Sequence, residues 1–200
     1  MLKLYYANGT CSSVVVMTAK SLGIELELIP VDVMKALLTD GSDYKNVTAK
    51  GYVPALQLEN GEIITETVAI CAYLSSLKAG NEVFPLAGKG LISQLEWFNY
   101  ISTELHKSFV TLFSKLFGAS IPDDMIENVK AHLTRRYEYV EKHLTHNAYL
   151  AGDHITSADY YLLMTTLWAV KTGYNVEQFP NVMAFQKRIM ADAVVQATLA

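Results

Sequence analysis

The chain has 200 residues, a formal net charge of −4, and a composition that is 51% hydrophobic and 18% charged. This balance predicts a folded protein with a large core, because a disordered chain has fewer apolar residues and a higher net charge. The mildly acidic charge argues against a nucleic-acid or anionic membrane partner. The apolar runs are also well below the roughly 18 residues of a membrane-spanning helix.

The N-terminal quarter of the chain predicts two strands joined by a helix. Apolar and polar residues alternate over 2–6 and again over 26–31, as in half-buried strands. A helical pattern over 13–22 lies between them and ends at Gly23, since glycine readily adopts the left-handed conformation that closes many helices. Residues 32–50 are polar and predict an irregular connection with one or two helical turns.

The next segment predicts a hairpin and a helix. Asn60-Gly61 separates strand patterns at 54–59 and 62–65, which indicates a tight turn with positive φ at both turn residues. An apolar helix is predicted over 66–77. The order βαβ, helical connection, ββα therefore predicts an α/β domain with a four-stranded mixed sheet and helices on both faces.

The rest of the chain predicts a second, all-α domain. Residues 79–90 contain several glycines and a proline, which is typical of a linker. Strand patterns are absent after this segment. We therefore expect one domain at 1–78 and an all-helical domain at 91–200.

The helical domain begins with one long predicted helix at 91–117, whose apolar residues recur every three or four positions. Thr156 and Asp159 have the spacing of a capping box at the start of a later helix. That helix is apolar on most sides and is expected to lie in the centre of the domain. The further helices are expected over 122–144, 157–171 and 179–191.

Cys11 is the strongest single candidate for chemistry. It falls between the first strand and the first helix, where the amides of a helix N-terminus stabilise a thiolate. Many cysteines are instead small buried core residues, which is the expectation for Cys71 in its apolar helix. No second cysteine lies at Cys-x-x-Cys spacing, so a dithiol redox cycle is not expected. Two cysteines do not make a disulfide framework, and they fit a reducing compartment such as the cytoplasm.

Two backbone positions could bind a ligand. A cis bond between Val53 and Pro54 would expose the Val53 N–H and C=O groups to an extended, peptide-like ligand, whereas a trans proline at a strand start is the ordinary alternative. The helix that begins near Thr65-Glu66-Thr67 could bind a carboxylate at its N-terminus, with Glu66 accepting from an ammonium group. Simple capping by Thr65 would explain the same residues.

The histidines give no metal pattern. His106 is a single histidine on the long predicted helix, and the others lack metal-type spacing with cysteine or carboxylate, so no metal site is expected. The chain also lacks the glycine-rich nucleotide loops and the Gly-x-Ser-x-Gly nucleophile motif.

Five short segments carry a family resemblance and occur in one order along the chain. They are LYYANGTCS at 4–12, AKGYVPAL at 49–56, ITE at 64–66, EWFNYISTELHK at 96–107, and GD with TSAD within 152–159. Together they resemble the bacterial beta class of glutathione transferases over essentially the whole chain.

The resemblance implies a thioredoxin-like N-terminal domain, an all-helical C-terminal domain, a homodimer and glutathione as co-substrate. It implies that Cys11 and His106 flank the glutathione sulfur, and that the backbone at Val53-Pro54 pairs with the cysteinyl unit. The other implied glutathione-binding residues are Lys35, Glu66, Thr67, Asn99, Thr103 and Glu104, of which the last three partly reach across the dimer. Secondary roles are implied for Tyr6, Ser12 and Lys107.

The activity implied is conjugation of the glutathione thiol to a small hydrophobic electrophile. We expect Phe109, Phe113 and Trp168, with Tyr174, to line the electrophile site, although these aromatics are equally explained as core. Two alternatives remain open: a glutathione-dependent thiol oxidoreductase or peroxidase that uses Cys11 covalently, and a non-catalytic protein that binds ligands or partners through the same fold. The chain differs from the family pattern at Asn8, Ala36 and Thr67.

Overall fold

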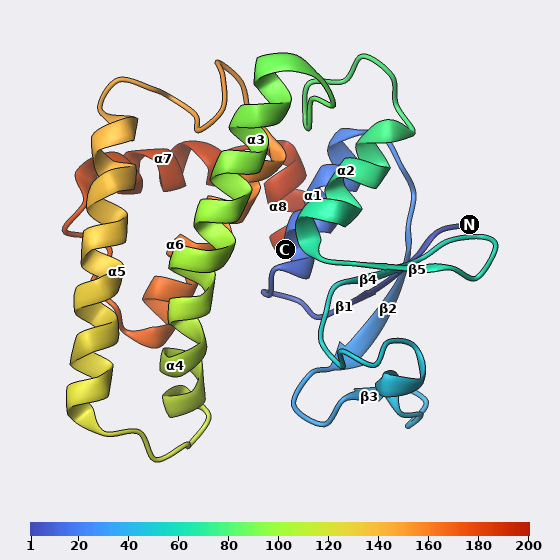
Figure 1. The fold of residues 1–200 in the computed structure, drawn as a ribbon, viewed down its shortest axis with the longest axis horizontal. Helices are drawn as coiled ribbons and strands as arrows, with labels where there is room; N and C mark the ends of the chain where they lie inside the picture. Colours follow the sequence, from blue (N-terminus) through green and yellow to red (C-terminus); the bar gives the residue numbers. More distant parts are fainter. The chain divides into compact units, whose positions relative to one another are not determined.

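The computed structural model describes residues 1–200, and the chain divides into two compact units (Figure 1). The first unit comprises Met1–Leu91 and Ala193–Ala200, and the second comprises Ile92–Asp192. None of the helices is both long enough and apolar enough to cross a membrane.

The first unit is built on a five-stranded mixed sheet with the strand order β3-β2-β1-β4-β5. Its central strand β1 (Lys3–Tyr6) is parallel to β2 (Glu27–Asp32), while β4 (Ala55–Gln57) and β5 (Ile63–Thr65) form an antiparallel hairpin on its other side. The predicted parallel pair and hairpin are confirmed. The fifth strand, β3 (Leu37–Leu38), corrects the predicted count of four, because two residues are too few to show a strand period. The helical elements of this unit are α1 (Ser12–Ser21), the 3-10 turn η1 (Tyr44–Asn46), α2 (Thr67–Ser76) and α8 (Ala193–Leu199).

The two faces of the sheet are covered differently. Leu4 and Tyr5 are adjacent in β1, so their side chains point to opposite faces, and both are buried. The Tyr5 ring packs against Tyr44 of η1 with ring centroids 5.7 Å apart. Helices α1 and α2 pack together on the other side of the sheet (Figure 1). Helices were predicted on both faces of the sheet, but α1 and α2 cover one face and only the 3-10 turn η1 packs on the other.

The end of α1 follows the sequence prediction. Gly23 has a φ of +63°, and its N–H donates to the carbonyl of Lys20 at 3.0 Å. The next N–H, that of Ile24, donates to Ala19 at 2.9 Å, which completes the usual closure of a helix by a left-handed glycine.

The β4–β5 turn differs from its prediction. Gly61 has a φ of +88°, but Asn60 does not have a positive φ, so the expected two-residue turn is wrong. The Gly61 N–H donates to Leu58 O at 3.0 Å, and the Leu58 N–H donates to Glu62 O at 2.8 Å. A loop of three residues results, in which only the last must be left-handed.

Helix α8 was not predicted, because the last helix expected from the sequence ends at about residue 191. It packs against α1, where Val195 is fully buried and Lys20 Nζ donates to the carbonyl of Ala197 at 2.6 Å. Residues that follow the second unit in the sequence therefore complete the first unit.

The second unit contains only helices, as predicted. The single helix predicted at 91–117 is interrupted by a π-helical segment, η2 (Ile101–His106), which corrects the sequence analysis. A π turn has five-residue hydrogen-bond spacing and leaves no trace in a pattern of apolar positions every three or four residues. The helices are α3 (Gly88–Tyr100), α4 (Lys107–Leu116), α5 (Asp123–Leu144), α6 (Ser157–Thr172) and α7 (Pro180–Met190).

Helix α6 is buried on most sides, as its sequence predicted. The predicted capping box is present: the fully buried Asp159 carboxylate accepts from the N–H of Thr156 at 2.8 Å and from its hydroxyl at 2.7 Å. The same carboxylate accepts from the N–H of Leu150 at 2.9 Å. Burial is the main reason that the pKa of Asp159 is raised to about 6.

Candidate functional site

Three chain segments of the first unit meet at one edge of the sheet. Tyr5 of β1 pairs with Ala55 of β4, and Ala55 pairs with Thr65 of β5. The end of β1, the start of β4 and the end of β5 therefore lie side by side. The loop to α1 follows β1, the Val53-Pro54 bond lies just before β4, and α2 begins just after β5. The predicted ligand-binding residues on these segments therefore gather at this edge.

Cys11 caps the N-terminus of α1 and lies against the backbone of Val53. Its Sγ donates to the Val53 carbonyl across 3.5 Å, and the Cys11 and Val53 side chains are both buried. The bond between Val53 and Pro54 is cis. Of the two possibilities raised by the sequence, this is the one that suits pairing with a peptide-like ligand. The thiol and the proposed ligand-pairing backbone are thus brought together.

Hydroxyl groups fix the loop that presents Cys11. Ser12 Oγ accepts from the Ala7 N–H at 3.0 Å and lies 2.7 Å from Thr10 Oγ1, and Ser12 is fully buried. Thr10 also donates to the Ala7 carbonyl at 2.7 Å. Ser12 therefore orders the loop before α1, while Tyr6 is a half-buried residue at the end of β1.

The start of α2 carries a backbone feature that sequence alone did not predict. Glu66 is the N-cap of this helix and has a φ of +75°, a costly conformation for a residue other than glycine. The alternative in which Thr65 caps the helix is therefore wrong. Thr67 begins the helix and is buried.

Lys50 is a residue of this edge to which the sequence analysis assigned no role. Its ammonium group forms an ion pair with Glu66 and donates to Thr65 Oγ1 at 2.8 Å. The hydrogen bond to Glu66 is the main cause of a raised pKa at Lys50. Lys35, the lysine that the resemblance implied, is exposed, and its Nζ lies 3.5 Å from Asp32 at the end of β2. It does not join Glu66.

In the second unit, the π-helical segment η2 carries three of the predicted residues: Thr103, Glu104 and His106. Such segments are often found at functional sites. His106 Nδ1 lies 2.6 Å from the hydroxyl of Tyr161 on α6, and its ring is 4.7 Å from that of Trp168. Burial lowers the pKa of His106 to about 4, with a smaller contribution from Lys107, so the imidazole is neutral at neutral pH.

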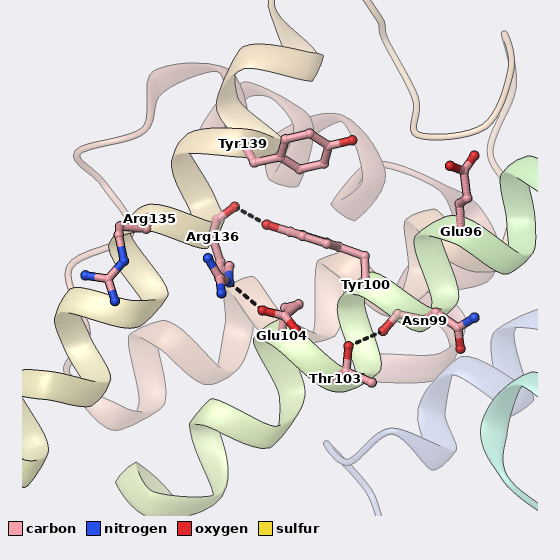
Figure 2. Close-up of a pocket in the computed structure, with 8 residues that line it drawn as sticks. All are labelled: Glu96, Asn99, Tyr100, Thr103, Glu104, Arg135, Arg136 and Tyr139. Atoms are coloured by element: carbon pink, nitrogen blue, oxygen red, sulfur yellow. Dashed lines mark hydrogen bonds and ion pairs between the residues drawn. The ribbon is translucent and has the colours of Figure 1, made fainter.

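Asn99, Thr103 and Glu104 line a pocket between α3–η2 and α5, with a volume of about 570 Å³ (Figure 2). The Thr103 hydroxyl donates to the Asn99 carbonyl at 2.9 Å. Glu104 points across the pocket to Arg136, whose Nε donates to Oε2 at 2.5 Å. The Arg136 carbonyl accepts from Tyr100 at 2.8 Å. The pocket is lined by Glu96, Asn99, Tyr100, Thr103, Glu104, Arg135, Arg136 and Tyr139.

The aromatic residues expected to bind an electrophile pack mainly with one another. Phe109 and Trp168 are almost fully buried, with ring centroids 6.1 Å apart, and Tyr174 is buried beside Phe109. Phe113 is partly exposed and lies 6.0 Å from Trp168. Core packing accounts for most of this cluster, so Phe113 is the member best placed to touch a ligand.

Family comparisons cover most of the chain. The glutathione S-transferase N-terminal domain matches residues 9–77, and the glutathione S-transferase C-terminal domain matches residues 91–193. Glutathione S-transferase GstA of Escherichia coli O157:H7 is 35% identical over 199 residues, which are 99% of this chain and 97% of that protein. This protein belongs to the glutathione S-transferase family.

Solved structures of glutathione S-transferases share its fold. A sphingomonad enzyme complexed with glutathione aligns with a TM-score of 0.90 and 26% identity, over 98% of this chain and 96% of that one. The bacterial beta class enzyme of Sphingomonas chungbukensis also aligns with a TM-score of 0.90 and 26% identity over 98% and 96% of the two chains. The resemblance to the beta class is therefore confirmed.

Within this glutathione S-transferase, the predicted residues fall into two groups. Cys11, Val53, Glu66 and Thr67 lie near one edge of the sheet in the first unit, whereas His106 lies in the second. Joint action of Cys11 and His106 on one sulfur stays a prediction. The partners Lys50, Tyr161 and Arg136 were missed because each lies many residues away from the group that it contacts.

The half-buried His106 predicts a pH dependence of folding stability. Its pKa is about 4 in the folded protein against 6.5 for an ordinary imidazole, so the unfolded chain binds the proton first as the pH falls. We expect His106 to lower the free energy of unfolding progressively between pH 6.5 and 4. Urea unfolding of wild type and His106→Gln across this range should show the two curves converging at low pH. His146→Gln, at an exposed position, is the control. Parallel curves for wild type and His106→Gln would contradict the expectation.

Proposed function

We propose that this protein is a glutathione transferase that conjugates the glutathione thiol to small hydrophobic electrophiles, and that it acts in the cytoplasm. The observation that carries the proposal is the Cys11 thiol at the N-terminus of α1, within 3.5 Å of the carbonyl next to the cis Val53-Pro54 bond. A thiol held there lies beside backbone groups that can pair with the cysteinyl unit of glutathione.

Glutathione binding uses the same edge of the sheet. The Val53 backbone pairs with the cysteinyl unit, and the Glu66 carboxylate accepts from the γ-glutamyl ammonium group. The N–H groups at the start of α2 and the Thr67 hydroxyl bind the γ-glutamyl carboxylate, since a helix N-terminus attracts anions. Lys35 lies near the glycyl carboxylate. Because Lys50 pairs with Glu66, the ligand ammonium group must share or replace that contact.

The chemistry needs a stabilised glutathione thiolate held against an electrophile. The N-terminus of α1 favours negative charge on a sulfur near Cys11. His106 is neutral at neutral pH, so it acts by hydrogen bonding rather than as a cation. Phe113 provides partly exposed apolar surface for the electrophile, with Phe109 and Trp168 behind it.

Calorimetric titration of the reduced protein with glutathione, run beside an aryl-halide conjugation assay, tests the proposal. We expect binding together with measurable turnover. Binding without turnover would favour thiol exchange or a narrower range of electrophiles. No binding at millimolar glutathione would overturn the proposal and would favour the non-catalytic reading, with Asn8, Ala36 and Thr67 as the altered positions.

Covalent use of Cys11 is the second candidate function, favoured by the position of its thiol at a helix N-terminus. In that reaction the Cys11 thiolate attacks the glutathione sulfur of a mixed disulfide between glutathione and another thiol, forms a disulfide with that glutathione and releases the other thiol as a thiolate. A glutathione thiolate then attacks the Cys11–glutathione disulfide, which frees the Cys11 thiolate and forms glutathione disulfide, so glutathione is oxidised and the other thiol is reduced.

The variant Cys11→Ser separates the two candidates. Conjugation should partly survive, because the helix N-terminus and His106 still act on the glutathione sulfur, whereas disulfide exchange should vanish. Both activities are measured on the same preparation, with Cys71→Ala as the control that removes the other, fully buried thiol. Disulfide exchange that persists in Cys11→Ser would contradict a covalent role for Cys11.

We also propose that the protein is a homodimer and that the face around Asn99, Thr103 and Glu104 contributes to the contact. Tyr139 on this face is 56% exposed, and the pocket beside it is lined by both acidic and basic side chains. A face of this kind can pair with its own copy about a two-fold axis.

The substitution Tyr139→Glu is expected to weaken the dimer, because it places two carboxylates near the symmetry axis. Sedimentation equilibrium should show a dimer for wild type and a shift towards monomer for the variant. Val170→Glu, which changes another exposed apolar residue in the second unit, is the control. A monomeric wild type, or a variant that stays fully dimeric, would contradict this assignment.

A further inference from the structure

The imidazole of His106 contacts the hydroxyl of Tyr161, a residue to which the sequence pattern assigned no role. His106 ends the π-helical segment η2, and Tyr161 lies in the first half of α6, 55 residues later. The two side chains meet with His106 Nδ1 and the Tyr161 hydroxyl oxygen 2.6 Å apart. This is a short contact for an O–H···N hydrogen bond.

Packing fixes the two rings as well as the hydrogen bond. Tyr161 is only 3% exposed, and its ring lies 5.6 Å from Phe98 and 5.9 Å from the imidazole, at 83° to the latter. Trp168, two helical turns further along α6, packs against the imidazole with ring centroids 4.7 Å apart and the ring planes tilted by 55°. Two aromatic residues of one buried helix therefore determine where the His106 ring lies and how it is turned.

The relative acidities of the two groups decide the direction of the hydrogen bond. A neutral imidazole has one nitrogen that carries a proton and one basic nitrogen that accepts. The basic nitrogen is a much better acceptor than a phenol oxygen, and the phenol O–H is the better donor, as their reference pKa values of about 6.5 and about 10 reflect. The favoured arrangement has Tyr161 donating to Nδ1.

We propose that Tyr161 is a positioning residue: its hydroxyl donates to Nδ1 of His106 and so keeps the ring proton on Nε2, where it can donate to the glutathione sulfur. The proposal rests on the proposed function of His106 beside that sulfur. Tyr161 itself does not touch the substrate.

Because the imidazole is neutral, the nitrogen that carries its one proton determines whether Nε2 can donate a hydrogen bond to the glutathione sulfur. Because burial lowers the pKa of His106 to about 4, the ring has a single N–H at neutral pH. If Nδ1 carried that proton, Nε2 would be an acceptor and would repel a thiolate lone pair. Besides Tyr161, the charged group that acts on this imidazole is Lys107, the next residue, whose ammonium also disfavours a protonated ring.

A double-mutant cycle in the conjugation assay tests the proposal. Tyr161→Phe keeps the ring and removes only the hydroxyl, so we expect roughly a tenfold lower kcat, with the KM for glutathione nearly unchanged. The apparent pKa of the bound glutathione thiol, read from the ultraviolet absorbance of its thiolate, should rise. In a His106→Gln background the same substitution should have almost no effect on either quantity, because the residue through which it acts is gone.

Tyr160→Phe is the matched control. It removes the hydroxyl of the neighbouring tyrosine, which is equally buried on α6, and should leave kcat and the thiol pKa unchanged. Equal losses from Tyr161→Phe in the wild-type and His106→Gln backgrounds would mean a merely structural role and would overturn the inference. An unaltered kcat in Tyr161→Phe would also overturn it.

Nitrogen NMR of the wild-type protein, labelled at histidine, tests the tautomer without any assay of turnover or any need for Tyr161→Phe to fold. The His106 signals are assigned by their absence in His106→Gln. A protonated Nε2 with a hydrogen-bonded, unprotonated Nδ1 supports the proposal, and a protonated Nδ1 overturns it. If wild type binds no glutathione but shows the Nε2 tautomer, the proposed function fails while the role of Tyr161 in fixing the ring stands.

Discussion

The pairing of β1 with β4 is the constraint on which the first unit depends. Because the two strands are antiparallel and Tyr5 lies opposite Ala55, the chain leaves β1 at the same edge where it enters β4. The residues just outside these strands, Cys11 and Val53, are consequently neighbours although 42 positions separate them. The pairing of Ala55 with Thr65 extends the same row and brings the start of α2 to this edge. The strand pairing thus brings a thiol, the Val53 peptide group and a helix N-terminus to one edge of the sheet.

The π-helical segment has a comparable importance in the second unit. Its six residues send two of the predicted site side chains to two different helices: Glu104 reaches Arg136 on α5, and His106 reaches Tyr161 on α6. In a regular helix, residues two positions apart already point about 200° apart, and widening the turn changes which neighbours each one meets. One local departure from helical geometry therefore affects both the pocket of Figure 2 and the surroundings of the His106 imidazole.

The elements that could be predicted from sequence are those with a local signature. The glycine end of α1, the capping box of Asp159 and the buried character of α6 all follow from residues within a few positions of one another. The sequence analysis missed the strand β3 and the helix α8 because both are too short to show a hydrophobic pattern. It missed the π segment because the wider turn changes the spacing of the apolar residues too little.

The residues of the candidate site also divide into those that the sequence predicted and those that it did not. Cys11 could be proposed as a site residue from its place between a strand and a helix, and the order of five motifs identified the family. The partners of the named residues could not be recognised, since Lys50 meets Glu66, and Tyr161 meets His106, only through tertiary structure. The strained backbone of Glu66 likewise has no sequence signature, because it is imposed by the junction of β5 with α2.

The placement of α8 has a consequence for synthesis of the chain. Val195 is buried against the unit that begins at Met1, while the whole second unit lies between them in the sequence. On the ribosome, the helical unit of residues 92–192 can emerge in full while the sheet still lacks its final helix. The part of the protein that emerges first is therefore completed last, after residues 193–200 have left the exit tunnel.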